Sequence, residues 1–335
     1  MALKPIDQQV VVITGASSGI GRETARRLAR AGARVVAASR SDAALASLVA
    51  DITRDGGTAD HVVCDVTDLA QVQALADRAE ERFGRIDTWV NNAGVLLYAD
   101  FERTAPEEFR RMMEVNFLSV VHGAQVALPA LRRAGGGALV TVSSGEAMLS
   151  LPFHSAYAAS KHAVDGALDS LRRELIARGD PISVAVVRPA VIDTPIYAIA
   201  RSRLTRRPSA PPPYYDPVVV AACIEFAATH PVRDVYAGGA ARAMAALQAV
   251  VPRTVDQAFG RVGIRLMQTD DPAAPREGNL DVPLDPGRSR RGLPRTGRRF
   301  SLYTWLAVRP ALRRTLTAAA SVVAVSALAR RIRRR

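Results

Sequence analysis

Two side chains suited to proton transfer stand four positions apart, Tyr157 and Lys161, and Ser144 precedes the tyrosine by thirteen residues. On a helix, the tyrosine and the lysine would be neighbours on one face. A free phenol has a pKa near ~10 and transfers protons poorly at neutral pH, but a fixed positive charge nearby lowers that value. The spacing therefore predicts a tyrosine that serves as a general acid or base. The alternative for the isolated pair is a solvated helix face.

A glycine-rich turn near the start of the chain indicates which class of ligand the protein binds. Residues 10–14 predict a strand, residues 22–30 predict a helix, and Gly15, Gly19 and Gly21 lie between them. Glycines there let the backbone turn tightly and approach a pyrophosphate, which the N–H groups of a helix N-terminus can bind. No Lys-Ser or Lys-Thr pair follows the last glycine, so the turn indicates a dinucleotide rather than a magnesium-bound triphosphate. The alternative is a turn that only joins strand to helix.

Several short segments agree in order and spacing with one known pattern. They are Thr14-Gly-Ala-Ser-Ser-Gly-Ile-Gly21, Asn91-Asn-Ala-Gly94, Asn116, Ser144, Tyr157 and Lys161. Together they resemble the short-chain dehydrogenase/reductase family, in its shorter single-domain branch, over roughly residues 7–240. Ala190 stands where the family commonly has glycine, which is a mild departure.

The resemblance implies a role for each matching residue. Tyr157 would give a proton to a carbonyl oxygen while the nicotinamide delivers a hydride to the carbon, and oxidation would reverse both transfers. Ser144 would orient that oxygen, Lys161 would hold the nicotinamide ribose and lower the tyrosine pKa, and Asn116 would support a proton-relaying water. The implied catalytic set is Asn116, Ser144, Tyr157 and Lys161. The implied cofactor-binding set is Gly15, Ser17, Ser18, Gly19, Ile20, Gly21, Ser39, Arg40, Asp65, Val66, Asn92, Ala93, Gly94, Tyr157, Lys161, Pro189, Ile192 and Thr194.

The end of the second predicted strand bears on which cofactor is used. Enzymes that prefer NAD usually place an acid there, against the ribose 2′-hydroxyl. This chain has Ser39 followed by Arg40, and a hydroxyl and a guanidinium can both hydrogen-bond a 2′-phosphate. We therefore expect NADP(H) to be favoured over NAD(H). The alternative is that Arg40 is only a solvated turn residue.

Short β-branched runs alternate with amphipathic stretches along the first 240 residues, and these elements must position the residues named above. The predicted strands are residues 10–14, 34–39, 60–65, 88–91, 138–143, 182–188 and 234–237. Residues 104–107 have the form of a capping box, which should open the helix that carries Asn116. Repeated βα units predict an α/β fold with a Rossmann-type, doubly wound parallel sheet in three α/β/α layers. Ligands then bind at the carboxyl ends of the strands.

Composition excludes several other classes of protein. The chain has 335 residues and two cysteines, Cys64 and Cys223, so it lacks a disulfide framework and zinc spacing, and a reducing compartment fits. The N-terminus lacks the apolar run of a signal peptide, which predicts a cytoplasmic location. His154 and His162 flank Tyr157 but belong to no ligand cluster, so we expect no metal. Ser144 has no Gly-x-Ser-x-Gly elbow around it, which argues against hydrolysis.

The segment after Thr194 should determine the substrate. Residues 195–215, which in this family commonly form a mobile flap, include apolar side chains, as do Leu149, Leu151 and Phe153 before the tyrosine. These side chains predict a lipophilic alcohol, ketone or aldehyde as substrate. The alternative is that they are ordinary core contacts.

The C-terminal part differs from the rest in charge and composition. Residues 288–335 carry fourteen arginines and no acid, whereas the first 287 residues hold 31 basic and 32 acidic residues. We expect a catalytic domain over residues 1–269, a flexible linker over 270–300 and a basic, partly apolar helical tail over 301–335. Residues 315–329 form an uncharged run too short to span a bilayer, so peripheral attachment to an anionic membrane surface is expected. A solvated tail is the alternative, and nucleic acid is the least favoured partner.

The sequence as a whole predicts an NADP-dependent oxidoreductase that acts on an alcohol or carbonyl substrate. Family habit implies a homo-oligomer. The alternative function is a non-catalytic NADP sensor or scaffold whose basic tail binds a partner or a membrane, and the complete set of Ser144, Tyr157 and Lys161 argues against it.

Overall fold

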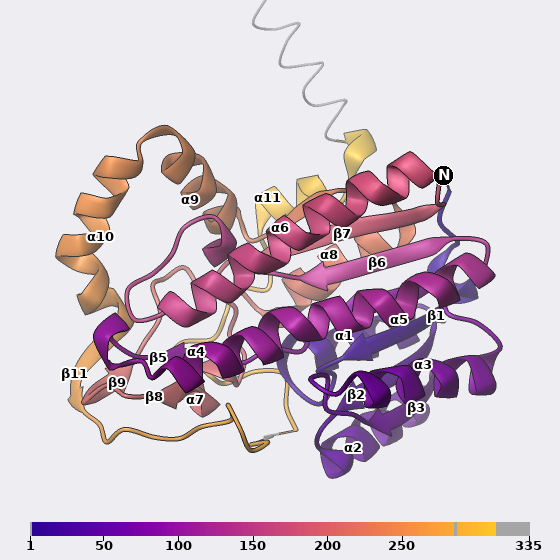
Figure 1. Ribbon diagram of the computed structural model, residues 1–335, viewed down its shortest axis with the longest axis horizontal. Helices are drawn as coiled ribbons and strands as arrows, with labels where there is room; N and C mark the ends of the chain where they lie inside the picture. Colours follow the sequence, from indigo (N-terminus) through magenta and orange to yellow (C-terminus); the bar gives the residue numbers. More distant parts are fainter. Residues whose placement is uncertain (1, 285–286, 313–335) are drawn as a thin grey trace, which may run out of the picture.

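A parallel seven-stranded sheet forms the centre of the computed structural model, which describes residues 2–284 and 287–312 (Figure 1). Its strand order is β10-β7-β6-β4-β1-β2-β3, and every neighbouring pair is parallel. The strands are β1 Val10–Thr14, β2 Arg34–Ser39, β3 Thr58–Val63, β4 Thr88–Asn91, β6 Gly137–Val142, β7 Ile182–Pro189 and β10 Asp234–Ala237. These ranges agree with the predicted strands to within two residues, and the predicted Rossmann-type fold is confirmed.

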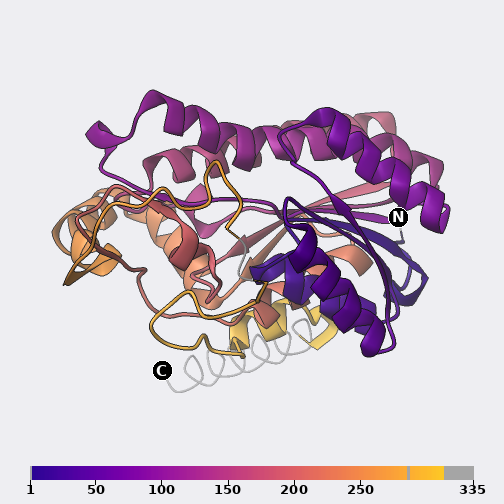
Figure 2. The same ribbon diagram turned by 90° about the horizontal axis from the view of Figure 1, so that it is seen from below.

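Helices cover both faces of the sheet, as Figure 2 shows with the sheet between two helical layers. One layer consists of α1 Gly19–Arg30, α2 Asp42–Arg54 and α8 Pro217–Thr229, and the other of α3 Leu69–Phe83, α5 Ser119–Arg133 and α6 Ser155–Arg178. Each layer packs on its own face of the sheet through a separate cluster of buried apolar residues. Strands buried on both faces are apolar along their whole length, which is why β1 reads Val-Val-Val-Ile without alternation.

The helix that should carry Asn116 differs from the prediction. The helix begins one residue later than predicted. Its N-cap residue is Ala105, whose N–H donates to the carboxylate of Glu108 and not to that of Glu107. The helix is also interrupted, with α4 over Pro106–Met113 followed by a π-helical turn, η3, over Glu114–Leu118 before α5 begins. Such turns insert a residue into the helix and are frequent at functional sites.

Smaller elements extend the fold beyond the carboxyl ends of the strands. Two short strand pairs lie there, β5 Leu97–Tyr98 with β8 Arg201–Ser202, and β9 Arg206–Pro208 with β11 Gln268–Pro272. The helices α7 Ile196–Ile199, α9 Gly239–Val250, α10 Pro252–Met267 and α11 Leu302–Ala307 also lie outside the layers. The short helical turns are η1 Ile6–Gln8, η2 Phe101–Arg103 and η4 Gly145–Ala147. In Figure 1, α9 and α10 stand at one end of the molecule.

Residues 276–298, within the range expected to be a linker, lie against the catalytic part of the chain. The buried carboxylate of Asp193 accepts N–H groups of Gly292, Leu293 and Gly297, and Arg290 pairs with the buried carboxylate of Asp216. We call residues 276–298, apart from the undescribed 285–286, the C-terminal segment. The apolar tail run, residues 315–329, lies outside the described residues. Among the described residues, no helix is both long enough and apolar enough to cross a membrane.

Candidate active site

The glycine turn lies between β1 and α1, at the carboxyl end of the sheet. Gly15 has a φ of +66°, and a Cβ on Gly21 would lie 2.3 Å from the Gly15 carbonyl oxygen. The amide of Asn92, at the end of β4, donates to the carbonyl oxygens of Thr14 and Gly15 at 3.0 Å each. These contacts require glycine and fix the turn against the neighbouring strand. No side chain caps the N-terminus of α1, but the carbonyl oxygen of Arg288, in the C-terminal segment, accepts the N–H of Gly19 at 3.0 Å. The shape of the turn fits a pyrophosphate, which would have to compete with Arg288 for that N–H group.

Most of the residues expected to bind a cofactor line two adjoining cavities. The first is lined by Gly15, Ser17, Ser18, Gly19, Ile20, Ser39, Arg40, Asp65, Val66, Asn92, Ala93, Gly94 and Thr194. The second is lined by Ser144, Tyr157, Lys161, Pro189 and Ile192, and also by Ile20, Asn92, Gly94 and Thr194 from the first set. Gly21 lies behind the turn. The two cavities therefore join along shared residues, as a dinucleotide site next to a substrate site requires.

Asn116 is fully buried in η3 and lines neither cavity. Its amide donates to the carbonyl oxygen of Val95 and to the Ser160 hydroxyl, and its carbonyl oxygen accepts the N–H of Val95. Asn116 thus fixes the loop after β4 to the helix that carries Tyr157. The buried amide is satisfied by these bonds, and the proton-relay role remains a prediction.

Tyr157 and Lys161 lie on α6 facing Ser144, which follows β6. The Lys161 ammonium lies 5.7 Å from the centroid of the tyrosine ring and donates to the carbonyl oxygen of Val142 at 3.2 Å. Burial lowers the pKa of Lys161 to about 8, although Asp165 acts in the opposite direction. Burial raises the pKa of Tyr157 above its ordinary value, assisted by the Glu146 carboxylate and opposed by a hydrogen bond with Ser144.

The raised pKa of Tyr157 is opposite to the lowering that the sequence predicts. The physical reason is that the ammonium of Lys161 lies over the ring, while removal of the hydroxyl from water disfavours the phenolate. In the described structure, Tyr157 is therefore held in its protonated form at neutral pH.

Two further residues lie beside the tyrosine, Glu146, which the sequence does not single out, and His154, for which it predicts no role. His154 is 2% exposed, and its Nδ1 lies 3.0 Å from a Glu146 oxygen, while its ring lies 6.0 Å from that of Tyr157. Both residues line the second cavity. Among the described residues, no cluster of His, Cys, Asp and Glu side chains could hold a metal ion. His162 is exposed and bonds its own helix at Ala158, so it lies apart from the site.

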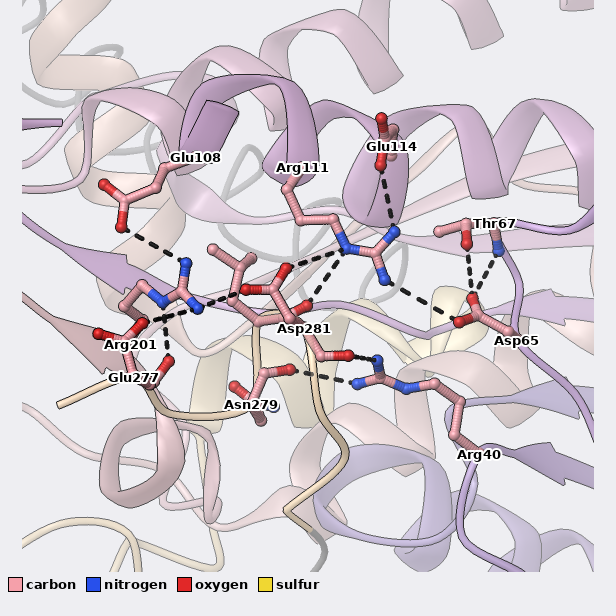
Figure 3. Close-up of polar contacts among 11 residues, drawn as sticks. Arg40, Asp65, Thr67, Glu108, Arg111, Glu114, Arg201, Glu277, Asn279 and Asp281 are labelled. Atoms are coloured by element: carbon pink, nitrogen blue, oxygen red, sulfur yellow. Dashed lines mark hydrogen bonds and ion pairs between the residues drawn. The ribbon is translucent and has the colours of Figure 1, made fainter. Parts of the chain in front are cut away.

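At the other end of the first cavity, charged side chains meet the C-terminal segment (Figure 3). Arg40 follows β2 and donates to the carbonyl oxygens of Asn279 and Asp281. Burial raises the pKa of Asp65, but two hydrogen bonds from Thr67, with Arg40 and Arg111 nearby, outweigh it and the pKa is lowered. Nothing in the family pattern marks the C-terminal residues, and the sequence did not predict their place here.

The second cavity has a volume of about 440 Å³ and mostly apolar walls. Leu149 and Leu151 contribute to it, as the sequence predicts, while Phe153 packs in the adjoining apolar cluster. The remaining apolar wall comes from Leu96, Ile196, Tyr197, Pro211, Pro212, Pro213, Ala240, Ala241, Ala243, Met244, Phe259 and Leu266. Helices α9 and α10 thus close the cavity with residues far beyond the Tyr157 helix in sequence.

Comparisons with known proteins agree with this geometry. The model of the family described as short chain dehydrogenase matches residues 9–204. The chain belongs to the short-chain dehydrogenase/reductase family. It is 38% identical over 313 residues to the uncharacterized oxidoreductase YxnA of Bacillus subtilis, covering 92% of this chain and 88% of that one. It is 42% identical over 191 residues to the dehydrogenase/reductase SDR family member 7B of Bos taurus, covering 55% of this chain and 58% of that protein.

Solved structures of this family share the fold. A short-chain dehydrogenase/reductase from Burkholderia phymatum, in complex with NAD, matches with a TM-score of 0.67 at 28% identity, over 77% of this chain and 97% of that one. An alcohol dehydrogenase from Thermococcus sibiricus, complexed with 5-hydroxy-NADP, matches with a TM-score of 0.60 at 27% identity, over 68% and 95%. The protein is therefore an NAD(P)-dependent oxidoreductase acting on CH–OH groups, as the sequence predicts, while the similar structures contain both kinds of cofactor.

Proposed function

We propose that this protein transfers a hydride between NADP(H) and a lipophilic alcohol or carbonyl compound, with Tyr157 as the general acid and base. The observation that carries the proposal is the meeting of Ser144, Tyr157 and Lys161 on the wall of an apolar cavity that adjoins the glycine-lined one. An ordinary solvated helix face would not place the phenol and the ammonium inside a cavity. Their burial argues for chemistry over surface charge.

Tyr157, Ser144 and Lys161 would have separate roles in the proton transfer to and from the substrate oxygen. A bound nicotinamide would supply the hydride to the carbonyl carbon. Tyr157, which is protonated at neutral pH, would give its proton to the carbonyl oxygen. Its raised pKa opposes this transfer, so positive charge from Lys161 would be needed to release the proton. Ser144, whose hydrogen bond favours the phenolate, would stabilise the tyrosine after the transfer and hold the oxygen in place. In the oxidative direction Tyr157 accepts the proton instead, and Lys161 provides positive charge to the phenolate.

The glycine turn and the residues around it would hold the cofactor. The N–H groups at the start of α1 and the Ser17 and Ser18 hydroxyls suit the pyrophosphate, provided that the Arg288 carbonyl oxygen releases the N–H of Gly19. Asp65 and Asn92 suit the adenosine half. The preference for NADP(H) rests on Ser39 and Arg40 at the end of β2, where no acid stands. The apolar cavity walls support the lipophilic substrate class.

Removal of the Tyr157 hydroxyl tests its role in proton transfer. We expect Tyr157→Phe to lower kcat for reduction of apolar aldehydes and ketones by about 10²–10⁴-fold, because general acid catalysis contributes this much, and to leave the NADPH dissociation constant unchanged. Tyr197→Phe is the matched control, since it removes a second hydroxyl from the same cavity wall. The proposal fails if both variants lose activity equally, or if the wild type reduces no member of a panel from small polar to long-chain apolar carbonyls.

The cofactor preference has a separate test. Titration with NADPH and NADH, followed by fluorescence, should give tighter NADPH binding to the wild type. Arg40→Met should weaken NADPH binding by about tenfold with little effect on NADH, because a charged hydrogen bond to the 2′-phosphate is lost. Tighter NADH binding to the wild type would contradict the preference.

A further inference from the structure

The C-terminal segment forms part of the wall at the adenosine end of the first cavity. Asn279, Pro283 and Leu284 line this cavity together with Ser39 and Arg40. The end of β2 is where dinucleotide enzymes recognise the ribose 2′ position, so these C-terminal residues lie beside that position. They belong to a region beyond the matched family segment, residues 9–204.

The segment already engages the arginine that would bind a 2′-phosphate. Arg40 donates to the carbonyl oxygens of Asp281 at 3.0 Å and of Asn279 at 3.2 Å (Figure 3). Burial lowers the pKa of Arg40, Asp65 and Asp281 act to raise it, and the positive charge of Arg111 lowers it further. Two guanidinium groups and two carboxylates thus influence one another at this end of the cavity.

Asp281 is held in place from the side away from Arg40. Its carboxylate lies 2.5 Å from the guanidinium of Arg201, which is 7% exposed, and 3.7 Å from Nε of Arg111 on α4. Arg111 also donates to the carbonyl oxygen of Leu280 at 3.4 Å. Figure 3 shows this carboxylate between the two arginines, with its backbone turned toward Arg40. These ion pairs fix the carboxylate before a ligand arrives, so no ordering is needed, while solvent and the paired arginines screen its charge.

We propose that Asp281 is a specificity-determining residue for the cofactor, because its carboxylate supplies at the adenosine end the negative charge that the end of β2 lacks. A 2′-phosphate then meets repulsion from Asp281 and competes with the C-terminal segment for Arg40. A 2′-hydroxyl meets neither penalty. This inference rests on the proposed role of Arg40 and deepens it: Arg40 attracts the phosphate, and Asp281 limits how far NADP(H) is preferred.

The charges at this end support that interpretation. Asp281 pairs with Arg201 and lies near Arg111, which in turn lies near Asp65 and pairs with Glu114. A 2′-phosphate adds up to two further negative charges beside these groups. Removal of the Asp281 charge would make this network more positive by one unit, next to the arriving phosphate.

Isothermal titration calorimetry of the full chain with 2′,5′-ADP and 5′-AMP tests the inference, since these probes differ only by the 2′-phosphate. Asp281→Asn keeps the size and the backbone carbonyl but removes the charge. We expect it to tighten binding of 2′,5′-ADP relative to 5′-AMP by about fivefold, a screened Coulomb effect of a partly exposed charge. Asp270→Asn is the matched control, because that carboxylate is fully exposed and pairs with Arg206 at the surface.

The ratio of the two dissociation constants isolates the charge effect from any loosening of the wall, which would weaken both probes alike. An unchanged or reversed ratio in Asp281→Asn, or an equal change in Asp270→Asn, would overturn the inference. The proposed NADP preference fails separately, through tighter NADH binding to the wild type or an Arg40→Met variant that still selects NADPH. A shifted ratio in Asp281→Asn would stand in either case.

Discussion

Lys161 should destabilise the folded protein when no cofactor is bound. The chain has two lysines, and this one is 4% exposed with one hydrogen bond, to the carbonyl oxygen of Val142. Burial lowers its pKa from 10.5 to about 8. At about 1.4 kcal/mol for each pKa unit, the ammonium costs the folded state roughly 3 kcal/mol. We therefore expect Lys161→Met to raise the free energy of unfolding at pH 7 by about 2–3 kcal/mol.

The difference in stability between Lys161→Met and the wild type should depend on pH. Below about pH 8 the lysine is charged in both the folded and unfolded states, so the full cost is present. Between about 8 and 10.5 the folded protein has lost the proton while the unfolded chain keeps it, so the wild type gains stability as the pH rises. The advantage of Lys161→Met should therefore be largest at pH 7 and disappear toward pH 10.5.

Urea unfolding followed by circular dichroism at pH 7, 8, 9 and 10 measures the difference between the two proteins. Lys161→Arg is the control, because arginine stays charged over this range and should show no gain with pH. A Lys161→Met variant that is less stable than the wild type at pH 7, or a difference that does not change with pH, would refute the reasoning. The same substitution should abolish turnover, since the lysine then has no charge to offer Tyr157.

Two further substitutions test the supports of the site, each against a control. Gly21→Ala should weaken NADPH binding at least tenfold in a fluorescence titration, because its Cβ would lie 2.3 Å from the Gly15 carbonyl oxygen. Gly260→Ala is the control, since a Cβ there meets open space and NADPH should bind normally. Equal NADPH binding by the two variants would refute the steric argument. Arg290→Met should lower the free energy of unfolding in urea by about 3 kcal/mol, because it leaves the buried carboxylate of Asp216 without its partner, and Arg206→Met, which loses only a surface pair, by less than about 1 kcal/mol.

The sheet could be predicted from the sequence because its signal is local. Central strands such as β1 and β6 are short apolar runs followed by a turn, and burial on both faces leaves few polar residues in them. The edge strand β3 contains Asp60 and His61, and its bounds are two residues away from the predicted ones. The order of the βα units then places every strand end at one edge of the sheet. This is why Gly15, Asn92 and Ser144, which are far apart in sequence, could be expected in one place.

Features that depend on contacts between distant segments were not predictable in this way. The raised pKa of Tyr157 comes from burial and from Glu146, which carries no distinctive signal in the sequence. The capping of α4 by Glu108 in place of Glu107 depends on one residue of register. The proline- and glycine-rich composition of residues 270–300 indicates a lack of regular structure, but it does not reveal that buried carboxylates bind the backbone there.

The C-terminal segment also bears on which relatives are informative about this protein. An alignment covering 92% of the chain, as with the Bacillus subtilis oxidoreductase, must include residues 276–298. The 191 residues shared with the bovine protein are too few to reach from the glycine turn to that segment. A comparison that includes both the glycine turn and Asp281 therefore needs a relative that aligns over most of the chain. If cofactor choice depends on Asp281, the family motifs alone do not predict which cofactor a relative prefers.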